Sequence, residues 1–217
     1  MPAGRFADVR WYAEVDSTNR VAADLARAGA PDGLVVGADH QTAGRGRRGR
    51  TWEAPPGAAL LVSVVLRPAP VLVTLAAGLA AAGACEAAAG ATVALKWPND
   101  LLLGDAKLGG ILTEAVNGAA VVGLGVNVAW APPGAARLGP DIDRDAVLHD
   151  YLTGLDAPGD VLDRYRSRCT TLGRRVRVEL PDGTVEGVAT DVDDDGRLVV
   201  AGRPIAAGDV VHVRPFR

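Results

Sequence analysis

The stretch of sequence with the densest chemistry reads Gln41-Thr42-Ala43-Gly44-Arg45-Gly46-Arg47-Arg48-Gly49-Arg50-Thr51-Trp52, and we call it the glycine–arginine loop. Its four arginines cannot all pack into an apolar core, and its interleaved glycines make the backbone mobile. The spacing G-x-G-x-x-G is formally present, but the prolines at 55 and 56 break the helix that a dinucleotide-binding fingerprint requires. Three interpretations stay open: a solvated basic loop, a nucleic-acid patch on which Trp52 stacks, and a lid whose arginines bind phosphate.

A second dense stretch runs from Lys96-Trp97-Pro98-Asn99-Asp100 through apolar residues to Lys107-Leu108-Gly109-Gly110-Ile111-Leu112. It predicts a β-hairpin with charged groups at the strand ends, where functional sites tend to lie. Lys96 and Lys107 are the only lysines among 23 basic residues. A lysine suits a carboxylate or a phosphate, although Lys107 could also simply keep an edge strand soluble. The paired glycines at 109–110 and 123–125 indicate either a close approach to the backbone or a bulge.

The composition excludes several classes of protein. The chain has 217 residues, 48% hydrophobic and 23% charged, which is too apolar for a disordered chain. Its net charge of −3 argues against a non-specific nucleic-acid binder. The two cysteines, Cys85 and Cys169, and the three histidines have no metal-binding or redox spacing, so we expect no metal held by such a motif and no disulfide scaffold.

The pattern of elements predicts an α+β fold with a mixed β-sheet flanked by helices, followed by a small β-barrel. Up to residue 172, strand-like segments at 9–15, 34–38, 59–66, 93–96, 101–103, 107–116 and 120–128 alternate with helical ones at 17–29, 69–90, 143–155 and 160–172. After Gly173 come short alternating strands with turns at Pro181-Asp182-Gly183 and Asp194-Asp195-Gly196. We therefore expect an α+β domain over residues 1–172 and a β-rich second domain over residues 173–217.

The N-terminal residues lack the apolar run of a signal peptide, and the Ala-rich segment 69–90 fits a buried helix better than a membrane span. We expect a cytoplasmic protein with neither a membrane nor a nucleic-acid partner.

Five blocks, in this order, resemble the biotin–protein ligases, which share a catalytic fold with the lipoate ligases and are related to the class II synthetase fold. The blocks are Ser17-Thr18-Asn19, the glycine–arginine loop, Lys96 to Asp100, Lys107 to Leu112, and Gly123 to Asn127. The β-rich tail resembles the SH3-like C-terminal domain of that family. The Gly-Arg-Gly-Arg-Arg-Gly run favours biotin, because the lipoate branch uses a different glycine-rich segment. Only 16 residues precede Ser17, so the resemblance implies the monofunctional type without an N-terminal DNA-binding domain.

The resemblance implies an ATP-dependent, AMP-forming ligase with ATP and biotin as substrates and Mg²⁺ accompanying the nucleotide. A biotin carboxylate attacks the α-phosphate of ATP, giving biotinyl-5′-AMP and pyrophosphate. A lysine of the biotin carboxyl carrier domain of a carboxylase then takes the biotinyl group. Cations must offset the repulsion between the two reacting anions. The resemblance leaves the oligomeric state open between monomer and homodimer.

The resemblance also implies the site residues, position by position. Lys107, Arg47 and Asp100 would be catalytic, with Asp100 orienting or deprotonating the acceptor amine. The biotin-binding residues would be Ser17, Thr18, Asn19, Gln41, Arg45, Gly46, Arg47, Lys107 and Gly110. The residues that bind ATP or the adenylate would be Arg45, Arg47, Arg48, Trp52, Asn99, Lys107 and Asn127. Short polar side chains at 17–19 suit the ureido ring of biotin, and they equally suit an ordinary helix N-cap.

Three alternatives compete with this assignment. One is a lipoate or octanoate ligase on the same fold. Another is a non-catalytic nucleic-acid-binding protein that uses the glycine–arginine loop, whose affinity would fall steeply with salt. The third is an inactive ligase that serves as a binding module, although every charged position of the five blocks is present.

Overall fold

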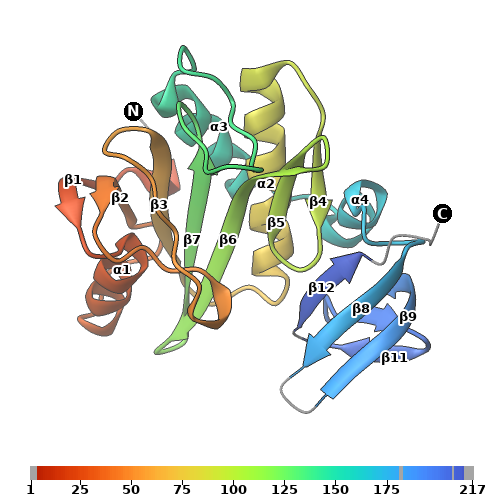
Figure 1. Ribbon diagram of the computed structural model, residues 1–217. Coiled ribbons are helices and arrows are strands. Elements are labelled where there is room, and N and C mark those ends of the chain that lie inside the picture. The colour runs from red at the N-terminus through yellow and green to blue at the C-terminus, as the bar shows by residue number, and fades with distance from the viewer. Residues whose placement is uncertain (1–3, 181–182, 207, 213–217) are drawn as a thin grey trace.

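The structure is a computed structural model that describes residues 4–180, 183–206 and 208–212. Its main element is a seven-stranded sheet with the order β1-β2-β3-β7-β6-β5-β4 (Figure 1). The strands are β1 (Val9–Val15), β2 (Val35–Gln41), β3 (Ala59–Leu66), β4 (Val93–Lys96), β5 (Asp100–Leu103), β6 (Ala106–Val116) and β7 (Ala119–Asn127). Only the β1–β2 pair is parallel, so the expected mixed sheet is confirmed.

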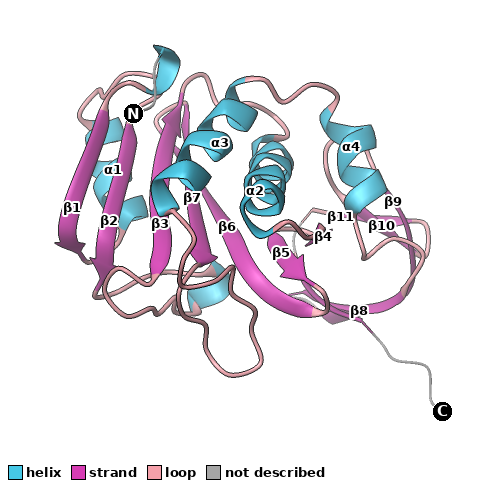
Figure 2. Cartoon of the chain, turned by 90° about the horizontal axis from the view of Figure 1, so that it is seen from above, coloured by secondary structure: helices cyan, strands magenta, loops and turns pink. Residues whose placement is uncertain are grey.

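Helices cover both faces of this sheet: α1 (Thr18–Arg27), α2 (Val73–Ala89), α3 (Arg144–Asp156) and α4 (Val161–Arg168). The alternation of β3 assigns the faces, because successive side chains of a strand point to opposite sides. Val62 and Val64 belong to the core cluster of α2 and α3, whereas Val65 belongs to that of α1. α2 therefore lies opposite α1, next to α3 (Figure 2).

The helix α2 is built mainly from alanine, and most of its side chains are buried between the sheet and the neighbouring helices. Small side chains permit this close packing: a Cβ on Gly154 of α3 would lie 3.2 Å from the Ala80 Cβ. The expected buried helix in the segment 69–90 is therefore present, over residues Val73–Ala89. Within the described residues, no helix combines the length and the apolarity that crossing a membrane requires.

The last helix ends earlier than the sequence predicts. α4 stops at Arg168, not near residue 172, because the chain switches to strand pairing. Cys169 forms a parallel bridge with Leu95 of β4, and the Thr170 amide donates to the Leu95 carbonyl at 2.8 Å. After this contact the chain continues from the edge of the large sheet into the C-terminal sheet.

The C-terminal segment forms a separate antiparallel sheet with the order β11-β10-β9-β8-β12. Its strands are β8 (Arg175–Leu180), β9 (Gly183–Val192), β10 (Leu198–Val200), β11 (Arg203–Ile205) and β12 (Asp209–His212). The turn predicted at 181–183 lies mostly outside the described residues, whereas a turn is present at 194–196. Figure 1 shows this sheet beside α4, at the β4 end of the large sheet.

The prediction that this second sheet closes into an SH3-like barrel is wrong. The edge strands β11 and β12 do not pair with each other in the described part of the chain, so the sheet is open. Its side chains Val176, Val178 and Leu198 are buried in the same hydrophobic core cluster as residues of the large sheet. The helix α4 contacts β9, so the open sheet packs against the rest of the fold.

Candidate active site

A small pocket of about 110 Å³ lies where the start of α1 meets the glycine–arginine loop and strands β6 and β7. We call it the small pocket. Many of the sequence-predicted site residues line it: Ser17, Thr18, Asn19, Gln41, Arg45, Gly46, Arg47, Trp52, Asn99, Lys107 and Gly110. Arg48, Asp100 and Asn127 are not among its lining residues. The structure therefore gathers residues from five separate sequence blocks around one cavity.

One wall of the small pocket is a chain of neutral polar groups. The Gln41 Oε1 atom accepts hydrogen bonds from the backbone amide and the hydroxyl of Thr18, at 2.8 and 3.0 Å. The Ser63 hydroxyl lies 2.9 Å from the Thr18 Oγ1 atom and donates to the Asn19 Oδ1 atom at 2.6 Å. Ser17 occupies the N-cap position of α1 but makes no side-chain capping bond there. The ordinary N-cap role considered for Ser17 is therefore not used.

Two residues that hydrogen-bond to this wall from behind the lining, Ser63 and Glu114, are absent from the sequence prediction. The Glu114 Oε2 atom accepts from Asn19 Nδ2 and from Arg45 Nη2, each at 2.8 Å. Ser63 is fully buried in the apolar strand β3. A lone polar residue inside an apolar strand needs a buried partner, and this signal could have revealed Ser63. Glu114 stands beside Thr113 in β6 and gives no such signal.

The opposite end of the small pocket is cationic. The Lys107 Nζ atom lies 2.6 Å from the Asp100 Oδ1 atom and 5.9 Å from the centre of the Trp52 ring. The register of β5 and β6 shifts at Leu101/Leu102, and such a bulge re-aims a side chain. A Cβ on Gly110 would lie 3.5 Å from the Lys107 Nζ atom, which is an ordinary contact distance. Asp100 does not line the small pocket, and its side chain is 22% exposed where it pairs with Lys107.

The glycines at 123 and 125 admit close neighbours, which is one of the two alternatives that the sequence left open. A Cβ on Gly125 would lie 2.8 Å from the Trp52 ring, and one on Gly123 would collide with the Asn19 amide. The indole thus lies directly on the β7 backbone. Its Nε1 atom is buried and has no hydrogen-bond partner. Asn127 lies elsewhere, because its amide holds the Ala136 carbonyl at 2.9 Å.

The glycine–arginine loop folds over the small pocket and is fastened at several points. Arg45 bridges to Thr51 across the loop, and the short 3₁₀ turn η2 (Arg47–Gly49) lies between them. The Arg47 Nη1 atom donates to the Asn99 side chain at 3.2 Å, and Arg48 Nη2 donates to the Glu179 carbonyl at 2.8 Å. Arg48 has a φ of 55°, an uncommon left-handed conformation for a side-chain-bearing residue. The loop thus contacts both sheets.

A larger cleft of about 730 Å³, the interdomain cleft, adjoins the small pocket. Its walls come from the loop residues 43–51, from residues 71–75 at the start of α2, and from Asp195 and Gly196 of the C-terminal sheet. The Trp97 indole, almost fully buried, donates to the Gly196 carbonyl at 3.0 Å. The C-terminal sheet is therefore part of the site's wall.

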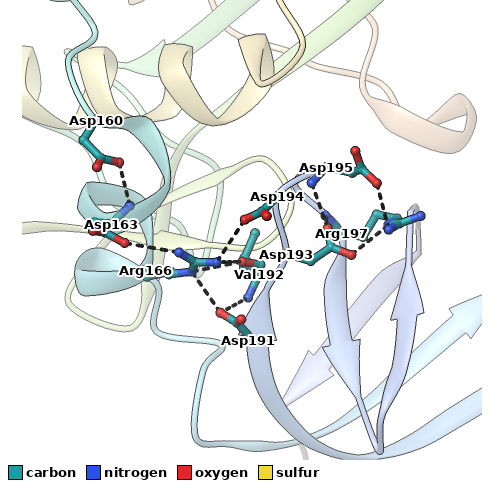
Figure 3. Close-up of polar contacts among 9 residues, drawn as sticks. All are labelled: Asp160, Asp163, Arg166, Asp191, Val192, Asp193, Asp194, Asp195 and Arg197. Carbon is teal, nitrogen blue, oxygen red and sulfur yellow. Dashed lines mark hydrogen bonds and ion pairs between the residues drawn. The ribbon is translucent and has the colours of Figure 1, made fainter.

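Figure 3 shows the polar contacts that hold the C-terminal sheet against α4. Arg166 donates to the Val192 carbonyl through Nε and Nη2, at 3.0 and 2.7 Å, and to Asp191 at 2.9 Å. Next to it, hydrogen bonds from Arg197 overcome desolvation and lower the pKa of Asp193. These contacts fix the turn at 193–196, which carries the cleft residues Asp195 and Gly196. In the described ranges, no group of three or more His, Cys, Asp or Glu side chains could hold a metal ion.

Known proteins match this chain over most of its length. The model of the Biotin/lipoate A/B protein ligase family matches residues 11–129, and that of the biotin protein ligase C terminal domain matches residues 171–213. The biotin--[acetyl-CoA-carboxylase] ligase of Mycobacterium tuberculosis is 43% identical, over 93% of this chain and 88% of that protein. That of Paracoccus denitrificans is 34% identical, over 88% and 92%.

The fold matches solved structures of the same kind. The biotin protein ligase from Aquifex aeolicus in complex with biotin and ATP superposes with a TM-score of 0.82 at 27% identity, covering 96% of this chain and all of that one. The biotin acetyl coenzyme A carboxylase synthetase from Helicobacter pylori with bound biotinylated ATP gives a TM-score of 0.74 at 25% identity, covering 91% and 98%. This chain belongs to the biotin/lipoate A/B protein ligase family.

Proposed function

We propose that this chain is a biotin–protein ligase that activates biotin with ATP to biotinyl-5′-AMP and transfers biotin to a lysine of a carrier protein. The observation that carries the proposal is the polarity of the small pocket. One wall offers the neutral polar groups of Thr18, Asn19 and Gln41, and the other end carries the cations of Arg47 and Lys107. A ureido ring needs the first, and a carboxylate meeting a phosphate needs the second.

The same polarity argues against lipoate and octanoate. A dithiolane ring or an alkyl chain has no N–H or C=O groups to pair with the polar wall. Buried polar groups that lose a partner cost about 1–3 kcal/mol each, so an apolar acyl group is disfavoured in this pocket. The nucleic-acid interpretation is disfavoured as well, because Arg45, Arg47 and Arg48 already contact Glu114, Asn99 and Glu179 within the fold.

In the first step, a carboxylate oxygen of biotin forms a bond to the α-phosphorus of ATP, and the bond to the bridging oxygen breaks to release pyrophosphate. We assign Lys107 and Arg47 to the charge that gathers there. The adenylate is then enclosed by Trp52, Arg45, Gly46 and Asn99, which all line the small pocket. Arg47 donates a hydrogen bond to the Asn99 side chain. We assign Arg48 and Asn127 a supporting part. Arg48 attaches the glycine–arginine loop to the Glu179 carbonyl, and Asn127 donates a hydrogen bond to the Ala136 carbonyl.

Mg²⁺ is proposed to arrive with ATP. The described residues form no ready-made metal site, so its ligands would be phosphate oxygens and water rather than a dedicated protein cage.

In the second step, the acceptor amine attacks the biotinyl carbonyl and AMP leaves. Asp100 is the carboxylate paired with Lys107, which lines the small pocket, and we propose that it orients or deprotonates that amine. We propose the biotin carboxyl carrier domain of a carboxylase as the acceptor and the cytoplasm as the compartment. The division into a catalytic domain over residues 1–172 and a C-terminal domain over residues 173–217 stays a prediction.

An ATP–pyrophosphate exchange assay tests this proposal directly. Biotin, lipoate and octanoate are supplied separately to the purified chain, and the label that returns to ATP is counted. Exchange that depends on biotin, followed by biotin on an added carrier domain, is the expected result. Exchange with lipoate or octanoate but not with biotin would overturn the substrate, and no exchange at all would overturn the enzyme.

A further inference from the structure

The neutral wall of the small pocket is held from behind by Ser63, the only polar residue of β3. Its hydroxyl contacts two side chains from the start of α1, those of Thr18 and Asn19. Ser63 pairs across the sheet with Gly123 of β7, and a Cβ on Gly123 would collide with the Asn19 amide. The glycine thus leaves room for that amide beside the serine. Because Ser63 is fully buried, the direction of each hydrogen bond around it follows from the donors and acceptors that surround it.

The orientation of the Asn19 amide is fixed by strand β6. Its Nδ2 atom donates to the Leu112 carbonyl at 3.1 Å and to the Glu114 carboxylate at 2.8 Å, so both of its hydrogens are used. The Oδ1 atom therefore faces Ser63, and the contact of 2.6 Å between them requires the serine hydroxyl to donate. The one hydrogen of Ser63 is thus committed to Asn19, and the Ser63 oxygen is left as an acceptor.

The Gln41 side-chain oxygen already accepts as many hydrogen bonds as it can. The backbone amide and the hydroxyl of Thr18 both donate to Oε1, at 2.8 and 3.0 Å. An amide oxygen has two lone pairs, so these two bonds fill it. The backbone amide is fixed at the first residue of α1, whereas the hydroxyl can rotate. An N–H group of a ligand can therefore bond to this oxygen only if the Thr18 hydroxyl turns away from it.

Ser63 supplies the acceptor to which the Thr18 hydroxyl can turn. The Ser63 Oγ atom lies 2.9 Å from the Thr18 Oγ1 atom, so rotation about the C–O bond of Thr18 moves its hydrogen from Gln41 to Ser63 without displacing a heavier atom. The buried hydroxyl keeps a partner in both positions, which avoids the cost of an unpaired polar group. A ligand ring without an N–H group gains nothing from this rearrangement.

We propose that Ser63 is a positioning residue that makes the small pocket specific for a ring with N–H groups: Thr18 donates to Ser63 while a ureido N–H of biotin donates to the Gln41 oxygen. This inference rests on the proposed function and adds to it a residue that does not touch the substrate. Ser63 acts through Thr18 and Gln41, which line the pocket. Without the serine oxygen, the Thr18 hydrogen stays on Gln41 and competes with the ring.

The test compares Ser63→Ala with the unsubstituted full chain in pyrophosphate exchange. Three ligands are supplied separately: biotin and the two isomers of biotin that carry a methyl group on one ureido nitrogen. We expect KM for biotin to rise about tenfold in Ser63→Ala, with KM for ATP and kcat unchanged, because the serine contacts only the neutral wall. One isomer lacks the N–H that Gln41 accepts, so the variant should not weaken its binding further. The ratio of its KM to that of biotin should therefore fall about tenfold.

Other variants of β3 serve as controls. Ser63→Thr keeps a hydroxyl and should restore most of the KM for biotin. Val64→Ala shortens the next side chain of the strand, which is equally buried but points to the opposite face. It should lower the melting temperature and leave the KM ratio unchanged. If Ser63→Ala does not fold, Ser63→Cys carries the same comparison, because a thiol is of similar size and is only a weak acceptor.

Three results would contradict the expectation in distinguishable ways. An unchanged KM for biotin in the folded variant, with normal exchange, would overturn the positioning role and leave the proposed function intact. An equal rise in KM for biotin and for both methylated isomers would also overturn it, since the hydroxyl would then support only the shape of the pocket. No exchange in the unsubstituted chain would overturn the proposed function, and the inference with it.

Discussion

Arg45 of the glycine–arginine loop and Glu114 of β6 share an ion pair of 2.8 Å, and the same Glu114 oxygen also accepts from Asn19 at 2.8 Å. One carboxylate oxygen therefore joins the loop to the polar wall of the small pocket. The wall continues through Ser63 and Thr18 to Gln41, where the loop begins. The position of the loop and the shape of the pocket are thus coupled through hydrogen bonds.

Replacing Glu114 by glutamine should loosen the loop. The amide keeps the shape but loses the charge that holds Arg45, and an ion pair this exposed contributes about 1 kcal/mol at most. Because the loop carries four arginines, trypsin cleavage between residues 45 and 50 reports its opening. We expect cleavage in the presence of biotin and ATP to rise about two- to fivefold, as measured by mass spectrometry. Glu186→Gln, which breaks a comparable pair with Arg177, is the matched control. Equal cleavage rates in the two variants would reject the coupling.

Removing the Lys107 ammonium should abolish the first step. Lys107→Ala takes away a cation and also leaves the Asp100 carboxylate unpaired beside the reacting anions, so repulsion adds to the loss. We expect biotin-dependent pyrophosphate exchange to fall by about 100-fold or more, with a cooperative thermal unfolding transition retained. Lys107→Arg keeps the charge on a broader group and should recover part of the rate. Exchange that is unchanged in Lys107→Ala would remove this residue from the chemistry.

Much of this fold and site could be predicted from the sequence. Glycines, lysines and arginines at the block positions mark places where a backbone approaches closely or a charge is needed, and such residue types stand out in a linear chain. Ser63 and Glu114 could not be found in this way, because the partners of each come from segments that are distant in the sequence. Their importance appears only when α1, β3 and β6 are brought together.

The barrel prediction failed for a different physical reason. Short alternating strands with tight turns specify antiparallel pairing between neighbours, but they do not specify whether the first and last strands meet. Closure depends on what else packs against the sheet, and here its buried side chains share one core cluster with those of the large sheet, with α4 in contact with β9. The contact of Arg48 with the Glu179 carbonyl could not be predicted either, because it joins the glycine–arginine loop to a strand of the C-terminal sheet that is far away in the sequence.

Adding a single methyl group at Gly125 should disturb the site, whereas adding one at Gly83 should not. The new Cβ in Gly125→Ala would lie 2.8 Å from the Trp52 ring, so the indole must move. We expect a loss of about 1–3 kcal/mol in unfolding free energy and weaker ligand binding. Gly83 lies in α2 with open space around its Cβ position, so Gly83→Ala should stabilise the chain by about 0.5–1 kcal/mol. Chemical denaturation and biotin titration measure both. Similar stabilities for the two variants would show that Trp52 does not rest on Gly125.

Both cysteines should be inert in the folded chain. Burial raises the pKa of Cys85 to about 12 and also raises that of Cys169. At pH 8 the Cys85 thiolate is then present in about one molecule in 10,000, and a thiol reagent needs the thiolate. The pKa of Cys85 is near 9 in the unfolded chain and higher in the folded one, so burying the neutral thiol stabilises the fold fully only below about pH 9. That stabilisation is lost as the pH rises toward 12, because the unfolded chain then ionises first. Ellman's reagent should label neither thiol at pH 8 until guanidinium is added. Rapid labelling of the native chain would contradict the burial.

Asp100 should separate the two half-reactions. Its carboxylate pairs with Lys107 outside the lining of the small pocket, whereas biotin and ATP are proposed to meet inside that pocket, under the glycine–arginine loop. Asp100→Asn keeps a hydrogen-bonding group near Lys107 but removes the proton acceptor for the incoming amine. We expect transfer from preformed adenylate to the carrier to slow by about tenfold or more, with a smaller change in pyrophosphate exchange.

The loss of transfer rate in Asp100→Asn should shrink as the pH rises, because a larger fraction of the acceptor lysine is then already deprotonated. Asp150→Asn, on the exposed side of α3, should change neither step. Equal losses in the two steps would place Asp100 in the support of Lys107 alone, because a residue that only holds the ammonium in place must affect adenylation as strongly as transfer.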